Sequence, residues 1–196
     1  GYSVTKAPYP VISFKEAMLT YGTDKPDLRN PLIIIDLSDF FAEVEFPAFR
    51  GKIVRGIRVP NAAKQSKKWF REMEKYALSI GMKGLGYISV NADMTYKGPI
   101  DKFMTDEQKQ KIAKLAGLQP DDVLYFISDE PDVVAKYAGQ IRTEVAKRLD
   151  LIDKDRFEFC YIVDFPMFEI TRRRERSTLL TIRSPCRRAK WRRWKR

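Results

Sequence analysis

The sequence contains no histidine and only two cysteines, Cys160 and Cys186. Without histidine, the Ser-His-Asp and Cys-His arrangements of nucleophilic enzymes cannot be built. The two cysteines also lack the spacing of zinc ligands. No apolar run approaches the roughly 18–20 residues that span a membrane, and the first residues do not resemble a signal peptide. These absences predict a soluble protein of the reducing cytoplasm, with no metal site and no membrane partner.

The sequence also lacks balanced charge. The chain has 37 Lys and Arg against 26 Asp and Glu, a net charge of +11. The last 26 residues hold 12 of the basic residues and a single acid, Glu175, which leaves 25 of each sign in the rest of the chain. Strong positive charge indicates a nucleic-acid partner through phosphate neutralisation. That inference applies here only to residues 170–196, which we call the tail.

Local signals predict four helices in the body of the chain. Ser13 and Thr105 each begin a capping box with the acidic or amide residue three positions later. Gly22, Gly81 and Gly117 follow apolar periodic segments as helix stops. Pro131 suits the first position of a long helix. The expected helices cover residues 14–21, 66–80, 106–116 and 131–149.

Runs rich in β-branched and aromatic residues predict the strands. We expect strands at residues 32–36, 52–59, 85–90, 123–127 and 157–163, with residues 38–60 mixing short extended pieces. Helices and strands alternate without a strict βαβ rhythm. The expected fold class is therefore α+β, with a mainly antiparallel sheet, packed helices and an irregular basic tail.

Two sequence blocks, with intermediate landmarks between them, carry a family resemblance. The blocks are Tyr-Gly-Thr-Asp-Lys-Pro-Asp-Leu-Arg at residues 21–29 and Val-Asp-Phe-Pro-Met-Phe-Glu at residues 163–169. The landmarks are Ile-Arg-Val-Pro at 57–60, Gly-Met-Lys-Gly-Leu-Gly-Tyr-Ile at 81–88 and Lys-Gly-Pro-Ile-Asp-Lys-Phe at 97–103. From about residue 8 to 169 the chain resembles bacterial-type aspartyl-tRNA synthetase, over the domain inserted into its catalytic core.

The resemblance implies a domain plan and a function. Residues 1–29 would form a border and hinge of the catalytic core, 30–154 a GAD-like insertion domain, and 155–169 a return strand of the class II core. Members of the family attach aspartate to tRNA using ATP and Mg²⁺, and they are homodimers. The three class II motifs and the anticodon-binding OB-fold have no counterpart here. We therefore expect a monomeric fragment, inactive alone, with no cofactor of its own.

Two other functions stay open beside this reading. The same type of insertion domain occurs in tRNA-dependent amidotransferase subunits, so the chain could be a stand-alone tRNA-binding or architectural module. It could also be the inert product of a disrupted gene. No catalytic residue is predicted in any of the three cases.

The charged residues of the first block are the candidate site residues. Asp24, Lys25, Asp27 and Arg29 surround Pro26, which forces Lys25 out of helical geometry and favours an ordered turn. Local charge pairing on a surface turn would explain them without any function. The resemblance instead places them, together with Asp164, at the hinge or beside the catalytic cleft.

Other chemistry-bearing residues have simpler explanations. Gly81, Gly84 and Gly86 lie after a helix and before a strand, the reverse of the order that directs helical amides at phosphate. The aromatic residues of the helix at 66–80 fall on one face and are expected in the core. The acids Asp121, Asp122, Asp129, Glu130 and Asp132 are expected to cap a helix start rather than to act in catalysis.

The tail has three competing explanations. Codons compatible with residues 177–194, when read two bases later, can encode Asp-Phe-Ala-His-Asn-Pro-Phe-Ser-Met-Pro-Gln-Gly-Glu-Met-Glu-Ala-Leu, which resembles the family sequence expected soon after the second block. We therefore expect a frameshift origin. An arginine-rich RNA-binding arm or a disordered extension are the alternatives. An arm would contact RNA non-specifically through Arg172, Arg173, Arg174, Arg187, Arg188, Trp191, Arg192, Arg193 and Trp194.

Overall fold

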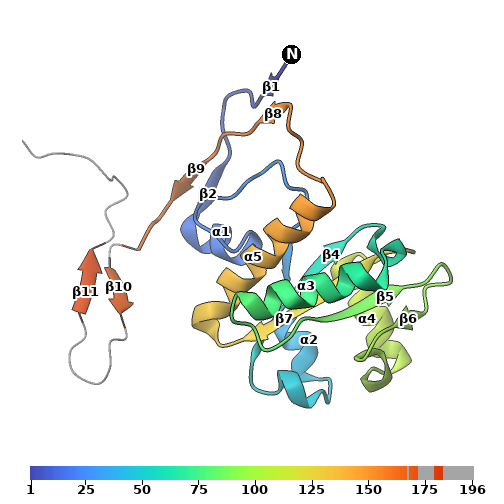
Figure 1. Cartoon of the computed structure of the whole chain (residues 1–196). Coiled ribbons are helices and arrows are strands. Elements are labelled where there is room, and N and C mark those ends of the chain that lie inside the picture. The colour runs from blue at the N-terminus through green and yellow to red at the C-terminus, as the bar shows by residue number, and fades with distance from the viewer. Residues whose placement is uncertain (167, 172–178, 183–196) are drawn as a thin grey trace, which may run out of the picture.

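The computed structural model describes residues 1–166, 168–171 and 179–182 (Figure 1). A five-stranded antiparallel sheet forms its centre, with the strand order β3-β4-β7-β5-β6. These strands are β3 (Ile34–Asp36), β4 (Ile53–Val59), β7 (Val123–Asp129), β5 (Gly86–Val90) and β6 (Tyr96–Lys97). The antiparallel sheet and its packed helices confirm the α+β prediction. Among the described residues, none of the helices combines the length and apolarity needed to cross a membrane.

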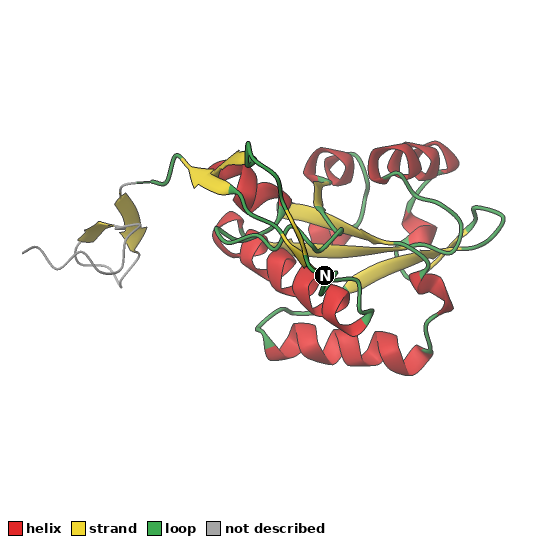
Figure 2. Cartoon of the chain, turned by 90° about the horizontal axis from the view of Figure 1, so that it is seen from above, coloured by secondary structure: helices red, strands yellow, loops and turns green. Residues whose placement is uncertain are grey.

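Helices cover both faces of this sheet (Figure 2). They are α1 (Phe14–Thr20), α2 (Ser38–Ala42), α3 (Lys67–Ser79), α4 (Asp106–Ala116) and α5 (Pro131–Arg148), joined by the 3-10 turns η1 (Pro47–Phe49), η2 (Ala62–Lys64) and η3 (Asp101–Phe103). The central strand β7 is buried on both faces, because its alternate residues point into two different cores. Tyr125 and Ile127 belong to the first core, while Leu124 and Phe126 belong to the second core on the opposite face of the sheet.

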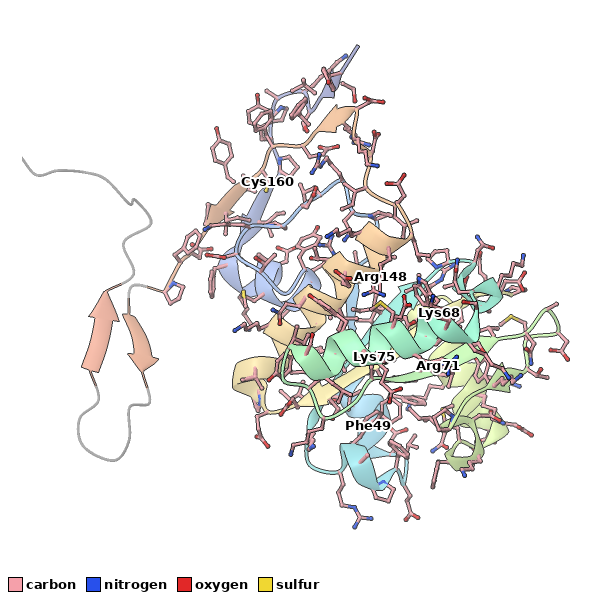
Figure 3. All side chains as sticks on the ribbon, in the orientation of Figure 1. Phe49, Lys68, Arg71, Lys75, Arg148 and Cys160 are labelled. Atoms are coloured by element: carbon pink, nitrogen blue, oxygen red, sulfur yellow. The ribbon has the colours of Figure 1, made fainter. Side chains whose placement is uncertain are left out.

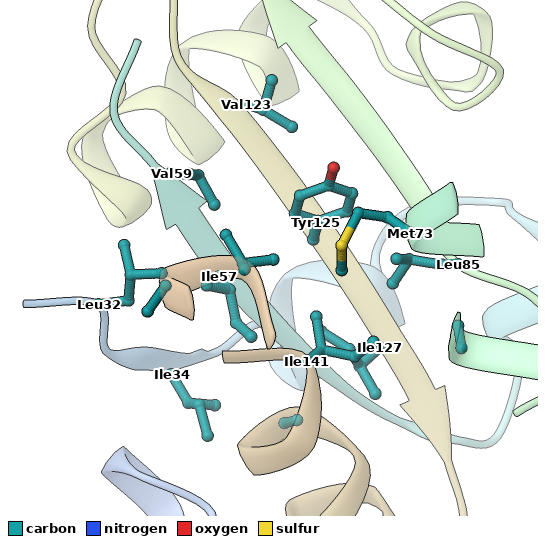
Figure 4. Packing of buried hydrophobic residues seen from close by; sticks show 14 of the residues in the cluster. Leu32, Ile34, Ile57, Val59, Met73, Leu85, Val123, Tyr125, Ile127 and Ile141 are labelled. Atoms are coloured by element: carbon teal, nitrogen blue, oxygen red, sulfur yellow. The ribbon is translucent and has the colours of Figure 1, made fainter. Parts of the chain in front are cut away.

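The first core lies between the sheet and the two long helices α3 and α5. Met73 and Ala77 of α3 and Ile141 and Val145 of α5 are fully buried there against Ile57 of β4. Figure 4 shows part of this packing around β4 and β7. The aromatic residues of α3 pack against the same core, as their helical spacing predicts.

Side-chain hydroxyls cap three helix starts, although the box predicted at Ser13 is only half formed among the described residues, because Glu16 does not accept from the Ser13 amide. The hydroxyls of Ser13, Ser66 and Thr105 accept backbone hydrogen bonds at the starts of α1, α3 and α4. The Thr105 box is complete, because Gln108 also accepts a bond from the Thr105 amide at 2.9 Å. Gly117 ends α4 in the left-handed conformation, with φ of 61°. These short-range interactions account for the accuracy of the helix predictions.

Outside the central sheet, segments from the two ends of the body lie side by side (Figure 1). Strand β1 (Ser3–Val4) pairs in parallel with β8 (Arg156–Phe157), and β2 (Val11–Ser13) pairs in parallel with β9 (Tyr161–Val163). We call these four the flanking strands. Within the tail, β10 (Phe168–Thr171) and β11 (Leu179–Ile182) pair antiparallel.

Two local predictions were wrong. The single strand expected at residues 157–163 is divided into β8 and β9, which pair with different partners. The stretch at 38–60, expected to mix short extended pieces, begins with the helix α2. Phe40 and Phe41 of α2 are buried in the second core, so tertiary burial of two adjacent aromatic side chains overrides the local pattern.

Candidate functional site

The candidate site is the loop between α1 and β3, which we call the junction segment (residues 22–32). It carries the chain from the flanking strands into the central sheet. Gly22 begins it with φ of 70° in the left-handed region. Pro26 and the short-range hydrogen bonds of its neighbours then keep the backbone out of a helix. The segment is therefore an ordered loop, as its sequence predicts.

Arg142 of α5 anchors the junction segment through side-chain hydrogen bonds. Its side chain is among the most deeply buried of the described residues, at 1% exposure. It donates hydrogen bonds to three backbone carbonyl oxygens: Nε to Leu32 at 2.5 Å, and Nη2 to Asn30 at 2.9 Å and to Asp27 at 3.1 Å. The guanidinium also lies over the Tyr21 ring, 5.0 Å from its centroid. One helical side chain thereby fixes a whole loop.

Among the described residues, no carboxylate forms an ion pair with this buried guanidinium. Burial lowers the pKa of Arg142 from its ordinary value, while Tyr21 and Asp27 act in the opposite direction. Asn30, also buried, completes the arrangement: its side-chain amide donates to the Arg142 carbonyl at 3.4 Å, and its Oδ1 accepts from the Leu32 amide at 3.0 Å. The fork geometry of arginine suits this task, because several fixed donors can meet carbonyls on different residues.

A close backbone contact supports the same junction. A Cβ atom at Gly139 of α5 would lie 2.5 Å from the Gly22 carbonyl oxygen, and one at Gly22 would lie 2.5 Å from the Gly139 amide nitrogen. Only glycine at both positions lets the loop and the helix approach this closely. The junction segment is thus held at its start by backbone packing and further along by Arg142.

Of the predicted site residues, Asp27 and Arg29 interact directly. Asp27 accepts from the Arg29 backbone amide at 3.1 Å and from Arg29 Nε and Nη2 at 2.9 Å and 2.8 Å. The bidentate hydrogen bond from the Arg29 guanidinium lowers the pKa of the Asp27 carboxyl. Both side chains are about one-third exposed, so the pair stabilises the loop locally and modestly.

The other predicted site residues are less constrained. Lys25 is exposed, and its backbone amide donates to Thr23 Oγ1 at 3.2 Å. Asp24 is half-buried, and Asp164 is exposed with φ of 58° in the turn after β9. Within the described residues, neither carboxylate has a hydrogen-bond or ion-pair partner. The structure therefore unites Asp27 and Arg29 and leaves Asp24, Lys25 and Asp164 apart from them.

Arg142 was missing from the sequence prediction, although a signal was present. It lies four residues after Ala138 and three before Val145, two fully buried positions of α5. Arginine on the apolar face of a helix indicates a buried polar partner.

The capping prediction for the acids was also wrong at Asp122. This buried carboxylate accepts from Arg58 Nε at 2.6 Å, from the Gln119 amide at 2.9 Å and from the Asn61 amide at 3.3 Å, and none of these groups belongs to the start of α5.

The predicted RNA contacts of the tail lie outside the described residues. They are Arg172, Arg173, Arg174, Arg187, Arg188, Trp191, Arg192, Arg193 and Trp194. The frameshift hypothesis concerns the same segment, and both stay predictions.

The flanking strands expose an unusual amount of apolar surface. Tyr161 is 58% exposed and Val11 is 63% exposed, on strands that pair with each other. Other large apolar side chains exposed on or beside these strands are Tyr2, Val4, Phe157, Phe159 and Val163. Cys160 lies in the same region, on the connection between β8 and β9 (Figure 3). Contiguous exposed apolar surface of this kind marks an interaction site.

Comparison with known proteins agrees with this geometry. Residues 46–138 match the GAD domain family. The chain is 45% identical over 166 residues to the aspartate–tRNA(Asp/Asn) ligase of Anaplasma phagocytophilum strain HZ, covering 82% of this chain and 28% of the relative. It is 42% identical over 172 residues to the same-named ligase of Rickettsia bellii strain OSU 85-389, covering 85% and 29%.

A ligase with a different name matches equally well. The aspartate–tRNA ligase of Streptomyces coelicolor is 44% identical over 169 residues, covering 86% of this chain and 29% of the relative. The chain thus spans less than a third of the length of these curated relatives. By this similarity the chain is a member of the aspartate–tRNA ligase family, of which it carries the GAD-containing segment.

Proposed function

We propose that this chain serves as the GAD-containing part of an enzyme that attaches aspartate to tRNA at the expense of ATP. The relatives' names supply the joining of aspartate to tRNA, and the resemblance to the synthetase family supplies the use of ATP. The similarity supports assigning this reaction to the protein of which this chain is a part. The matches extend over 166 to 172 residues, well beyond residues 46–138 of the GAD domain. That extent favours a ligase segment over a stand-alone module that shares the domain.

The exposed flanking strands carry this proposal. A two-stranded sheet is marginally stable alone, and parallel strands are normally buried on both faces. Here β2 and β9 are parallel, and their exposed side chains include Val11 and Tyr161. Further strands of the ligase would cover these edges and faces. The flanking strands thus act as the attachment surface to a catalytic part, and the junction segment transmits a fixed orientation to the GAD domain.

The described residues do not fit a metal site of their own. Among them, no three His, Cys, Asp or Glu side chains come together as metal ligands. We assign Mg²⁺, ATP and aspartate to other parts of the ligase, because the three class II motifs of the family have no counterpart in this chain. The contribution of this chain is structural: Arg142 and the Gly22–Gly139 contact hold the junction, and no catalytic step passes through its side chains.

A chimeric enzyme tests the proposal. In the Anaplasma phagocytophilum ligase, the region matched by this chain would be replaced by the corresponding residues of this chain. We expect the chimera to retain aspartate-dependent ATP–pyrophosphate exchange and tRNA charging. The 196-residue chain alone should show no exchange, because the groups that bind ATP and aspartate lie elsewhere. A folded chimera without activity, or robust exchange by the isolated chain, would contradict the proposal.

A charge introduced at the attachment surface provides a second test. Val11→Asp in the chimera places a charge where the catalytic part should cover β2, so activity and stability should fall. Leu115→Asp places the same charge at an exposed apolar position of α4, outside the flanking strands, and should have little effect. The proposed role also implies a cytoplasmic location. It further implies that this segment is monomeric when it is separated from the rest of the ligase.

A further inference from the structure

Helix α3 presents a row of basic side chains to solvent. Lys67, Arg71 and Lys75 recur every four residues, so they share one side of the helix. Lys68 lies next to them, and Lys64 precedes them in η2. All five side chains are exposed, and Figure 3 shows Lys68, Arg71 and Lys75 along α3. We call these five residues the basic face.

Most of this positive charge is not neutralised by partners. Lys64 pairs with Asp121 at 2.9 Å, and Lys68 approaches Glu72 at 3.9 Å. Within the described part of the chain, Lys67, Arg71 and Lys75 form no ion pair. The neutral total charge of the body therefore conceals a local positive surface. Charges segregated in this way create a field that attracts anions.

A cavity lies at the foot of the basic face. Its volume is about 560 Å³, within the range of ligand pockets. Lys67, Arg71, Phe70 and Tyr87 all line it, and the Phe70 and Tyr87 rings stack on each other with centroids 4.5 Å apart and an interplanar angle of 13°. Tyr125 also lines it, and its hydroxyl is buried with no hydrogen-bond partner among the described residues.

We propose that the basic face and this cavity form a binding site for RNA, with the phosphates on the basic face and one unpaired base in the cavity. Lysine and arginine neutralise phosphates, and aromatic side chains accept an unstacked base. An acidic peptide would satisfy the charges but would leave the flat aromatic walls without a matching group. Glu74 also lines the cavity and repels phosphate there, so the phosphates are expected on Lys67, Arg71 and Lys75 and the uncharged base in the cavity.

The biological setting of this site rests on the proposed function, since the ligase acts on tRNA. The site itself rests on separate observations, namely the basic face, the stacked rings and the unpartnered hydroxyl. A binding measurement on this chain involves no ligase activity. Failure of RNA binding at α3 would therefore leave the proposed function intact, and an inactive chimera would leave this site intact.

The test measures fluorescence anisotropy of a labelled 12-nucleotide single-stranded RNA with the full 196-residue chain over a salt series. The variant Lys67→Glu/Arg71→Glu/Lys75→Glu should bind at least 10-fold more weakly than the unmodified chain, and its salt slope should fall by about 2. The matched control reverses three exposed lysines on other helices, Lys114, Lys136 and Lys147. Because the tail is identical in all three proteins, any difference reports on the helices.

The cavity is tested separately at Tyr87. Tyr87→Leu removes the stacking ring and should weaken single-stranded RNA binding about 5- to 100-fold. Tyr87→Phe keeps the ring and should bind within about twofold of the unmodified chain. Duplex RNA, which has no unpaired base, should bind equally to all three.

Two outcomes would overturn the proposal. Equal losses in the α3 variant and in the control would assign the binding to non-specific charge, and unchanged binding by Tyr87→Leu would exclude the cavity as a base site. Circular dichroism checks that each variant is folded. The charge variants alter only exposed residues, so they decide the question even if Tyr87→Leu loses its fold.

Discussion

Replacing Arg142 by methionine should destabilise the protein by about 2–4 kcal/mol. The guanidinium donates to the carbonyl oxygens of Asp27, Asn30 and Leu32, and hydrogen bonds to a charged donor each contribute about 1.5–3 kcal/mol. The gross loss is therefore about 5–9 kcal/mol. Methionine also removes the cost of burying a charge, several kcal/mol in proteins, which offsets part of that loss.

The expected loss of stability is large enough to measure by thermal unfolding. For a chain of this size, each kcal/mol lowers Tm by about 2–4 °C, so Arg142→Met should lower it by about 5–15 °C. The loosened junction segment should also become accessible to trypsin after Arg29 under native conditions. Arg71→Met, at an exposed position without an ion pair among the described residues, is the control and should change stability by less than about 0.5 kcal/mol.

Arg142→Lys distinguishes geometry from charge. A lysine ammonium keeps the positive charge, but it lacks the planar fork that reaches three carbonyl oxygens. We expect it to recover only part of the lost stability. The reasoning would be refuted if Arg142→Met behaved like Arg71→Met, or if Arg142→Lys restored full stability.

Two further predictions concern the same junction. In chemical denaturation, Gly139→Ala should destabilise the protein by about 1–3 kcal/mol, because the new Cβ would lie 2.5 Å from the Gly22 carbonyl oxygen. This cost outweighs the better helix propensity of alanine. Gly84→Ala is the control and should be nearly neutral, because a Cβ there would enter open space. The Arg29 guanidinium lowers the pKa of the Asp27 carboxyl from 3.8 in the folded state. The Asp27–Arg29 pair therefore stabilises the protein fully above pH 3.8, and this stabilisation is lost as the pH falls through the folded pKa. In acid titrations, Asp27→Asn should remove this component, worth under about 1 kcal/mol for a pair so exposed; an unchanged acid profile would count against the pair.

The sequence determined those features that depend on neighbours along the chain. Ser66, Thr105 and Gly117 mark helix ends through hydrogen bonds or backbone conformations that span only a few residues. The strands β4, β5 and β7 follow from β-branched and aromatic runs long enough to be read locally. The family resemblance also depended only on the order of residues along the sequence, and the relatives confirm it.

Only the tertiary structure decided which distant residues meet. Arg142 and the junction segment are more than a hundred positions apart, and no local pattern states that three carbonyl oxygens will face that guanidinium. Phe40 and Phe41 form a helix because the second core buries them. The basic face is likewise hidden in a neutral composition, since charge counts carry no information on which side chains share a surface. Local hydrogen bonding was readable from the sequence, whereas burial and electrostatics became defined only when the chain folded.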